Sequence, residues 1–140
     1  HMYESNQFET LQVADYIEKL VRQLQEGYGA RIRVETRLQP LELPADRALT
    51  LGLLVNEVVS NAFKHAFPDG REGSIRVTLE IRDEGHALLT IKDDGVGAPE
   101  TGGRQGMGTR LVRGFAERLG GEPHVWRRDG TEFELRFPLR

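Results

Sequence analysis

Apolar residues recur at two different periods along the chain, and the two periods separate helices from strands. Three segments have apolar side chains at every third or fourth position, which is the period of an amphipathic helix. These segments predict helices over residues 11–26, from 46 to about 66, and around 111–119. Asp46 is expected to be the N-cap of the second helix, and glycines follow the first and the third.

Alternation of apolar and polar residues marks strands with one buried face. It runs through residues 32–38, 75–81, 87–91 and 133–137. Turn residues at 83–85 and at 129–130 predict two antiparallel hairpins. The order is helix, strand, helix, two strands, helix, two strands. It predicts an α/β fold, a two-layer sandwich in which three helices cover one face of a mixed, mostly antiparallel sheet.

Length and composition narrow the class of protein. A chain of 140 residues is one ordinary domain. A net charge of −3 disfavours nucleic-acid binding, and the absence of cysteine excludes disulfides and thiolate metal sites. No apolar run is long enough to span a membrane, and no signal peptide opens the sequence. We expect a cytoplasmic domain over residues 3–140, without direct membrane contact, and interpret His1 and Met2 as an expression scar.

The second predicted helix carries a polar stripe on an otherwise apolar surface. Glu57, Asn61 and His65 follow one another at intervals of four residues and so share one face. A helix that is apolar nearly all round is usually buried, and a buried carboxylate needs a partner. One interpretation is that the stripe is exposed to solvent or hydrogen-bonded to neighbouring backbone. The other is a site for Mg²⁺ and phosphate, because Mg²⁺ prefers oxygen ligands. His65 alone is more typical of a packed histidine than of a ligand.

The strand over residues 87–91 is expected to end in an inward-facing carboxylate. Asp93 has the parity of the buried positions of this strand, whereas Asp94 has the opposite parity. An inward carboxylate requires a strong hydrogen bond, for which the exocyclic amine of adenine is a suitable donor. Gly95 and Gly97 would leave room for a flat ring. The alternative is a tight turn with a capping aspartate.

Two further segments fit the same interpretation. Residues 106–109, Gly-Met-Gly-Thr, precede the third predicted helix and would offer free amide groups and a positive helix end to an anion. Residues 98–105 before them are expected to form a mobile lid over phosphates. Thr131 has the parity of Phe133 and is expected to face inward near the same sheet end. The alternatives are an ordinary glycine-rich loop with a threonine cap, and a plain strand threonine.

Taken in order, these segments resemble the four ATP-binding boxes of the superfamily that groups DNA gyrase, Hsp90, histidine kinases and MutL. The boxes are Glu-x-x-x-Asn-x-x-Lys-His at 57–65, Asp-x-Gly-x-Gly at 93–97, Gly-x-Gly-Thr at 106–109 and Gly-Thr-x-Phe at 130–133. Residues 54–67 are especially similar to bacterial sensor histidine kinases of the HisKA_2 type. The phenylalanine of the lid in commoner kinases and the Trp-x-Glu motif of the HWE kinases are absent from this sequence.

The resemblance implies the Bergerat ATP-binding fold and a role in the site for each box. Asp93 would bind adenine, with Gly95 and Gly97 letting the ring approach and Thr131 supporting it through water. The phosphates would be held by the backbone of residues 106–109, which are Gly106, Met107, Gly108 and Thr109.

The Asn-containing box would hold the metal and the phosphates of ATP. Asn61 would bind Mg²⁺, and His65 would lie at the nucleotide. Lys64 would contact the phosphates as a catalytic group. Glu57 would be either a ligand in the metal shell or a base that activates water.

The resemblance also implies a kinase whose phospho-acceptor lies elsewhere. Histidine kinases carry that histidine on a separate upstream dimerisation domain, and neither His86, in a hairpin turn, nor His124, near a strand start, matches it. We expect a catalytic domain that transfers the γ-phosphoryl of ATP to a histidine of that dimerisation domain. The parent would be a homodimer with a response regulator downstream. The alternatives are an anti-sigma factor serine kinase of the same superfamily and a non-catalytic ATP-sensing module.

Overall fold

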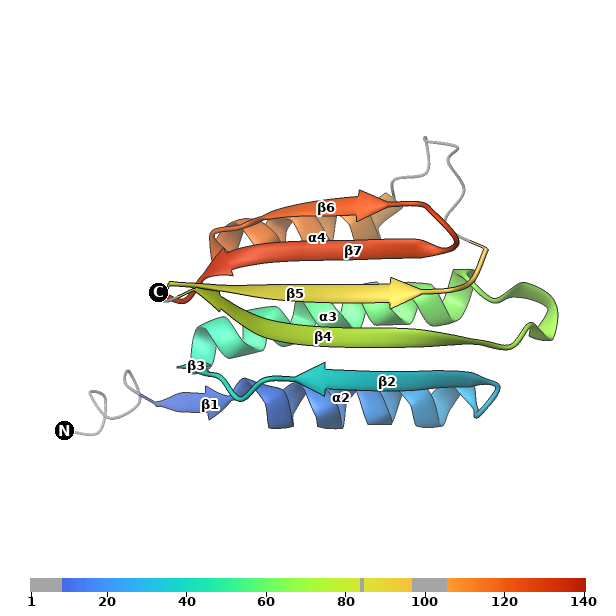
Figure 1. Cartoon of the computed structure of the whole chain (residues 1–140), viewed down its shortest axis with the longest axis horizontal. Helices are drawn as coiled ribbons and strands as arrows, with labels where there is room; N and C mark the ends of the chain where they lie inside the picture. Colours follow the sequence, from blue (N-terminus) through green and yellow to red (C-terminus); the bar gives the residue numbers. More distant parts are fainter. Residues whose placement is uncertain (1–8, 84, 97–105) are drawn as a thin grey trace.

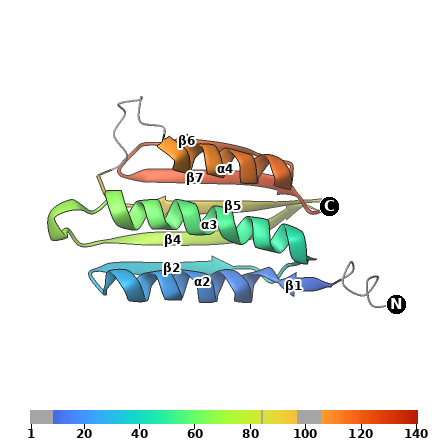
Figure 2. The ribbon, with the colours of Figure 1, turned by 180° about the vertical axis from the view of Figure 1, so that it is seen from behind.

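The computed structural model describes residues 9–83, 85–96 and 106–140, with the backbone alone for residues 106–109. The elements in chain order are β1 (Thr10–Gln12), α2 (Val13–Tyr28), β2 (Ile32–Leu38), β3 (Glu42–Pro44), α3 (Ala45–His65), the 3₁₀ turn η1 (Pro68–Gly70), β4 (Gly73–Asp83), β5 (His86–Asp93), α4 (Gly106–Leu119), β6 (Glu122–Trp126) and β7 (Thr131–Pro138). Figure 1 shows one layer of strands in front of the three helices, and Figure 2 shows the helices from behind.

Five strands form the main sheet, in the order β2-β4-β5-β7-β6. Strand β2 runs parallel to β4, and every other neighbouring pair is antiparallel. The parallel pair arises because the chain passes through α3 between β2 and β4, as a crossover connection requires. Both predicted hairpins are present. The predicted two-layer sandwich with a mixed, mostly antiparallel sheet is therefore confirmed.

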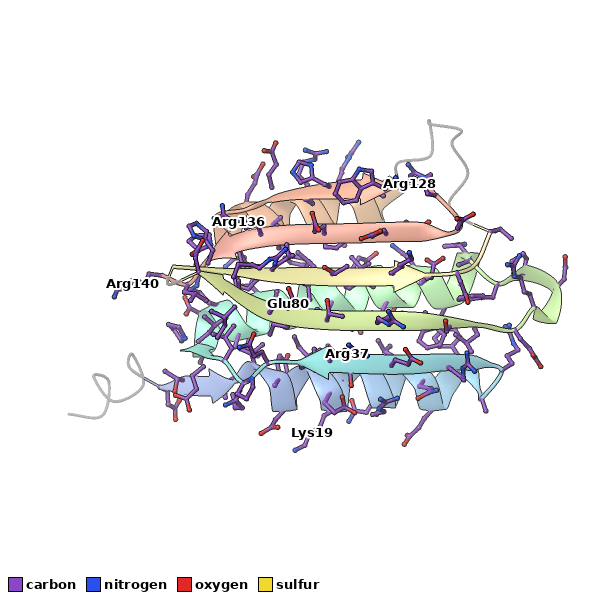
Figure 3. The ribbon with its side chains drawn as sticks, viewed as in Figure 1. Lys19, Arg37, Glu80, Arg128, Arg136 and Arg140 are labelled. Carbon is purple, nitrogen blue, oxygen red and sulfur yellow. The ribbon has the colours of Figure 1, made fainter. Side chains whose placement is uncertain are left out.

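The core lies between the sheet and the helices. The strands contribute the side chains that alternate toward the helices, and the helices contribute one stripe each. The strand residues in this core are Ile32, Val34, Ile75, Val77, Leu79, Ala87, Leu89, Ile91, Phe133, Leu135 and Phe137. The opposite face of the sheet is mostly polar, and Figure 3 shows Arg37, Glu80 and Arg136 on it. Leu88 also lies on this face, paired with Glu80 and Arg136. No helix in the described ranges is long and apolar enough to cross a membrane.

Strand β2 is an edge of the sheet, and side chains of α2 cover its free main-chain groups. Arg22 Nη1 donates to the carbonyl oxygen of Val34 at 2.9 Å, and Gln25 Nε2 donates to that of Ile32 at 3.2 Å. An open edge strand is a template for unwanted pairing, so these contacts protect the edge.

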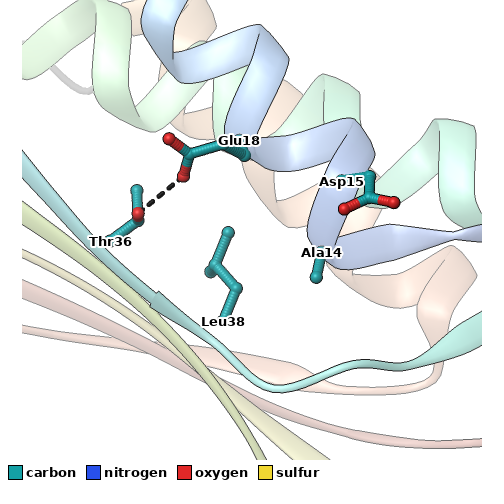
Figure 4. A pocket seen from close by; sticks show the side chains of 5 residues that line it. All are labelled: Ala14, Asp15, Glu18, Thr36 and Leu38. Carbon is teal, nitrogen blue, oxygen red and sulfur yellow. Dashed lines mark hydrogen bonds between the residues drawn. The ribbon is translucent and has the colours of Figure 1, made fainter.

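A hollow between α2 and β2 lies beside this protected edge (Figure 4). It is lined by Ala14, Asp15, Glu18, Thr36 and Leu38. The hydroxyl of Thr36 donates to Glu18 Oε1 at 2.6 Å. This hydrogen bond, followed by that from Arg22, lowers the pKa of Glu18. The hollow is apart from Asp93, because β4 separates β2 from β5.

The starts of two helices differ from the prediction for one physical reason. Residues 10–12 pair with 42–44 as an antiparallel ribbon, so α2 begins at Val13 rather than at residue 11. The ribbon also brings the carbonyl oxygen of Glu9 to the amide of Ala45 at 3.1 Å. Pro44 therefore occupies the N-cap position of α3, and the predicted cap, Asp46, lies within the first turn. The carbonyl oxygen of Glu9 thus satisfies the first amide of α3, and Asp46 Oδ1 accepts a hydrogen bond from the amide of Arg47 at 2.9 Å.

The predicted buried faces of α3 and α4 are too wide. Leu53 on α3 is 52% exposed and Leu111 on α4 is 44% exposed, although both belong to apolar patterns. On α4, the residues that face the sheet are Val112, Ala116 and Leu119. The helix packs one side against the sheet, which leaves the flank of its apolar stripe in solvent.

Truncation of leucines on the two faces of α4 tests this packing. Leu119→Ala removes a fully buried side chain, so the free energy of unfolding should fall by about 2–5 kcal/mol. Leu111→Ala, the matched control, should change it by about 0.5 kcal/mol or less beyond helix propensity. Urea unfolding followed by circular dichroism measures both. Equal losses would contradict the assigned faces.

Candidate functional site

The candidate site lies at the end of the central strand β5. Its last residue, Asp93, is 6% exposed and pairs with Ile75 of β4 on one side and Thr131 of β7 on the other. The amide of Val96 donates to the carbonyl oxygen of Ala66 at 2.9 Å, which ties the end of β5 to the end of α3. Figures 1 and 2 show the start of α4 at the same end of the molecule.

The carboxylate of Asp93 is oriented by two main-chain amides. Its Oδ1 accepts hydrogen bonds from the amides of Gly95 at 2.9 Å and Thr131 at 3.3 Å. Desolvation is the largest influence and raises the pKa of Asp93, while the two hydrogen bonds partly oppose that rise. The structure thus holds a buried acidic group in one orientation, where its charged form is poorly solvated by water.

Two glycines allow this arrangement. A Cβ at Gly95 would collide with the main chain of Ala66 at the end of α3. A Cβ at Gly130 would collide with the carbonyl of Asp93, and Gly130 also has a φ of 112° that favours glycine. Gly95 was predicted to leave room for a ring. The structure shows that glycine is also needed at this position for the end of β5 to pack against α3. Gly97 lies outside the described residues.

Asp94 has the opposite orientation, as its parity predicted. Its side chain is on the exposed side of the chain and accepts hydrogen bonds from the amide of Ser74 at 2.8 Å and from the hydroxyl of Ser74 at 3.2 Å. The assignment of Asp93 rather than Asp94 as the inward carboxylate is confirmed.

The polar stripe of α3 is partly exposed. Glu57 and Asn61 are half-buried, and Asn61 Nδ2 lies 3.4 Å from Glu57 Oε2 as a hydrogen-bond donor. Lys64 and His65 are exposed in the last turn. Of the two interpretations of this stripe, a partly exposed polar face agrees with the observed burial, and a site for Mg²⁺ and phosphate stays a prediction.

Two oxygen-bearing side chains one turn apart fit a Mg²⁺ ion that keeps water and phosphate ligands. Among the described residues, no group of three or more histidine and acidic side chains could hold a metal by itself. Mg²⁺ typically binds through one or two protein groups and substrate phosphates, so Glu57 and Asn61 match that pattern. Glu57 and Asn61 thus suit an ion that is bound together with a polyphosphate.

The remaining predicted residues lie in or beside α4 and β7. Residues 106–109 form the first turn of α4 rather than preceding it, and their side chains are outside the described part. The predicted lid, residues 98–105, is outside it as well. Thr131 is half-buried opposite Asp93.

Sequence reasoning missed three residues that shape the site. Gly130 was recognised as part of a turn and of the Gly-Thr-x-Phe box, but its close packing on Asp93 was not predicted. Ser74 and Arg71 hold the chain beyond Asp93 through Asp94, and no motif marks them. Ser74 precedes Ile75, the observed partner of Asp93 in the β4–β5 pair.

Comparisons with known proteins agree with this geometry. The family described as "Histidine kinase-, DNA gyrase B-, and HSP90-like ATPase" matches residues 46–140. "Blue-light-activated histidine kinase 2" of Erythrobacter litoralis is 34% identical over 118 residues, which are 81% of this chain and 34% of that protein. The chain thus spans about a third of that relative's length.

A solved structure and a shorter relative extend the comparison. The histidine kinase domain from the Erythrobacter litoralis EL346 blue-light activated histidine kinase superposes with a TM-score of 0.86 at 29% identity, covering 92% of this chain and 62% of that chain. The Anti-sigma F factor of Priestia megaterium is 24% identical over 123 residues, covering 79% of this chain and 82% of that protein. The matched family spans the sheet end, α3 and α4 together, and the chain therefore belongs to the family of histidine kinase-, DNA gyrase B- and HSP90-like ATPases.

Proposed function

We propose that this chain is the ATP-binding catalytic domain of a sensor histidine kinase. The observation that carries the proposal is the buried, oriented carboxylate of Asp93 at the end of β5. An exocyclic amine of adenine would give this carboxylate the strong donor that burial makes valuable. Histidine kinases among the relatives, at 34% identity in the first case, support this choice of activity.

The adenine would sit against the end of the sheet, and the phosphates would extend toward α3 and α4. Asp93 would read the base, and Thr131, its neighbour in register, would support it through water. The N-terminal turn of α4, residues 106–109, would present backbone amides to the phosphates. Lys64 and His65 are exposed in the last turn of α3, where they can meet a charged ligand.

Glu57 and Asn61 would hold the Mg²⁺ that accompanies ATP. When bound, this ion would neutralise charge on the β- and γ-phosphates. Asn61 supplies an amide oxygen and Glu57 a carboxylate, both in side chains that water reaches. Glu57 would orient Asn61 through their hydrogen bond at 3.4 Å and serve in the metal shell or as a base.

The phospho-acceptor would come from outside the described residues. Transfer breaks the bond from the γ-phosphorus to the bridging oxygen and forms one to an imidazole nitrogen, which needs an in-line nucleophile. His86 lies seven residues from Asp93 along β5, about 23 Å at the usual strand rise. His124 is on edge strand β6, and His65 belongs to the site's own helix. We therefore propose a histidine on a separate dimerisation domain as acceptor, with a response regulator downstream.

A second candidate is an anti-sigma factor kinase, which would phosphorylate a serine. It is favoured by the similarity to the Anti-sigma F factor over 82% of that protein's length. A non-catalytic ATP-sensing module would share the pocket and lack transfer. Phosphotransfer and the chemistry of the labelled product separate the three.

Asp93→Asn should separate nucleotide binding from stability. The amide cannot offer a charged acceptor to adenine, so ATP affinity should fall about 10- to 100-fold. The free energy of unfolding near pH 7 should stay equal or rise, because the variant removes a desolvated charge. Calorimetric titration and urea unfolding measure the two effects.

The stability difference between Asp93→Asn and wild type should depend on pH in a defined direction. Folding raises the pKa of Asp93, so its ionised form costs stability, fully so above the folded pKa. The advantage of Asp93→Asn should shrink as the pH falls through that pKa toward the ordinary aspartate value of about 4. Asp15→Asn, on exposed α2 surface, is the control and should show no such advantage. An Asp93→Asn variant less stable than wild type near pH 7 would contradict the account.

Asn61→Ala should remove the Mg²⁺-dependent part of ATP affinity and leave adenosine binding nearly unchanged. The reason is that the substitution deletes an oxygen ligand on α3, whereas the carboxylate proposed to bind adenine lies at the end of β5. Titrations with and without Mg²⁺ measure the difference. Ser60→Ala, one position earlier on α3 and also half-buried, is a matched control. The assignment fails if the metal dependence of Asn61→Ala equals that of wild type.

The chain alone should bind ATP without labelling itself. With a dimerisation domain of a sensor kinase added in trans, radiolabelled ATP should label a histidine. A phosphoramidate is acid-labile and alkali-stable, whereas phosphoserine behaves in the opposite way. Acid-stable label would favour the serine kinase, and tight binding with no transfer to any tested acceptor would favour the sensing module.

A further inference from the structure

The main chain just beyond Asp93 is held by residues that no ATP-binding box assigns to the nucleotide. Asp94 continues the β4–β5 ladder by one residue, since its amide donates to the carbonyl oxygen of Ser74 at 3.3 Å. Its carboxylate returns two hydrogen bonds, from the Ser74 amide at 2.8 Å and the Ser74 hydroxyl at 3.2 Å. A Cβ at Gly73 would collide with this carboxylate, so the glycine makes room for it.

A second anchor comes from two arginines. Arg71 Nη2 donates to the main-chain carbonyl oxygen of Asp94 at 3.1 Å. Arg71 is itself placed by the turn that follows α3, because its amide donates to the carbonyl oxygen of Pro68 at 3.1 Å. Arg31 Nη1 donates to the carbonyl oxygen of Arg71 at 2.6 Å and to that of Phe67 at 3.4 Å. The chain before β2, the turn after α3 and the end of β5 are thereby linked.

We propose that Asp94 and Arg71 are positioning residues for adenine recognition. This inference rests on the proposed function, in which Asp93 accepts a hydrogen bond from the amine of the base. The amide of Gly95 that orients Asp93 immediately follows Asp94, so a shift of Asp94 moves the donor. Hydrogen bonds weaken steeply with misalignment, and a site must be held within about 0.5 Å of its productive geometry.

The position of these contacts explains why two exposed residues matter to a buried one. On its other side, Asp93 is fixed by Thr131 and by the close approach of Gly130. Within the described residues, the chain after Asp93 is otherwise held by the bond from the Val96 amide to Ala66 and by the bond from the Gly95 amide to Asp93 itself. Asp94 and Arg71 thus supply the restraint that fixes the Gly95 amide against the carboxylate.

The test compares affinities for ATP and inosine triphosphate, which lacks the exocyclic amine. Wild-type protein should prefer ATP by about 10- to 100-fold, the value of a hydrogen bond to a charged acceptor. Asp94→Ala and Arg71→Met should each narrow this preference, by roughly threefold or more. Asp94→Asn should restore it, because its amide can accept from the Ser74 amide and donate to the Ser74 hydroxyl. Arg76→Met, on β4 and paired with Glu35, is the matched control and should retain it.

Each outcome bears on one claim. If a variant loses affinity for ATP and for inosine triphosphate by the same factor, its preference for ATP is unchanged. The residue would then have a merely structural role, and the inference would be overturned. An unchanged preference in both variants, or failure of Asp94→Asn to restore it, would overturn the inference as well. If Asp94→Ala does not fold, Arg71→Met carries the test, since it removes one exposed hydrogen bond. A wild-type protein with no preference for ATP would overturn the proposed function instead.

Discussion

The carboxylate of Asp93 is buried at the end of the central strand, where its ionised form loses most of its hydration. The surrounding chain is arranged to tolerate it. Two main-chain amides face Oδ1, and a glycine turn brings one of them into place. The register of β5 between β4 and β7 determines that this position faces inward at all. A one-residue slip would place Asp94 there and move the core residues Ala87, Leu89 and Ile91 to the opposite face of the sheet.

The other residues of the candidate site destabilise the fold much less, because their side chains are not fully buried. Glu57, Asn61, Lys64 and His65 lie on the surface of α3 that water reaches, so a charged ligand can meet them without prior desolvation. This division suits a nucleotide. In the proposed complex, the base would be bound by one buried carboxylate, whereas the phosphates would be bound by exposed side chains and by the amides at the start of α4.

The sequence predicts the layers and the key carboxylate because both depend on strict periodicity. Alternation along β5 is enough to distinguish Asp93 from Asp94. The ribbon of β1 and β3 could not be found, because each strand has three residues and too few positions to show a period. That ribbon also explains the wrong N-cap, since α3 begins directly after Pro44 of β3 and Asp46 therefore lies in its first turn. The exposure of Glu57 depends on how α3 packs, and the contacts of Arg71 join residues distant in sequence, so neither has a local signal.

The pKa of the Asp93 carboxyl, followed by carboxyl carbon NMR shifts in the free and the ADP-bound domain, tests the central claim most directly. The account predicts a pKa above that of an ordinary aspartate in the free domain, because burial disfavours the charge. It predicts a lower pKa with ADP bound, because an amine donor favours the ionised form. An ordinary pKa in the free domain that does not change when ADP binds would contradict both the burial and the adenine contact.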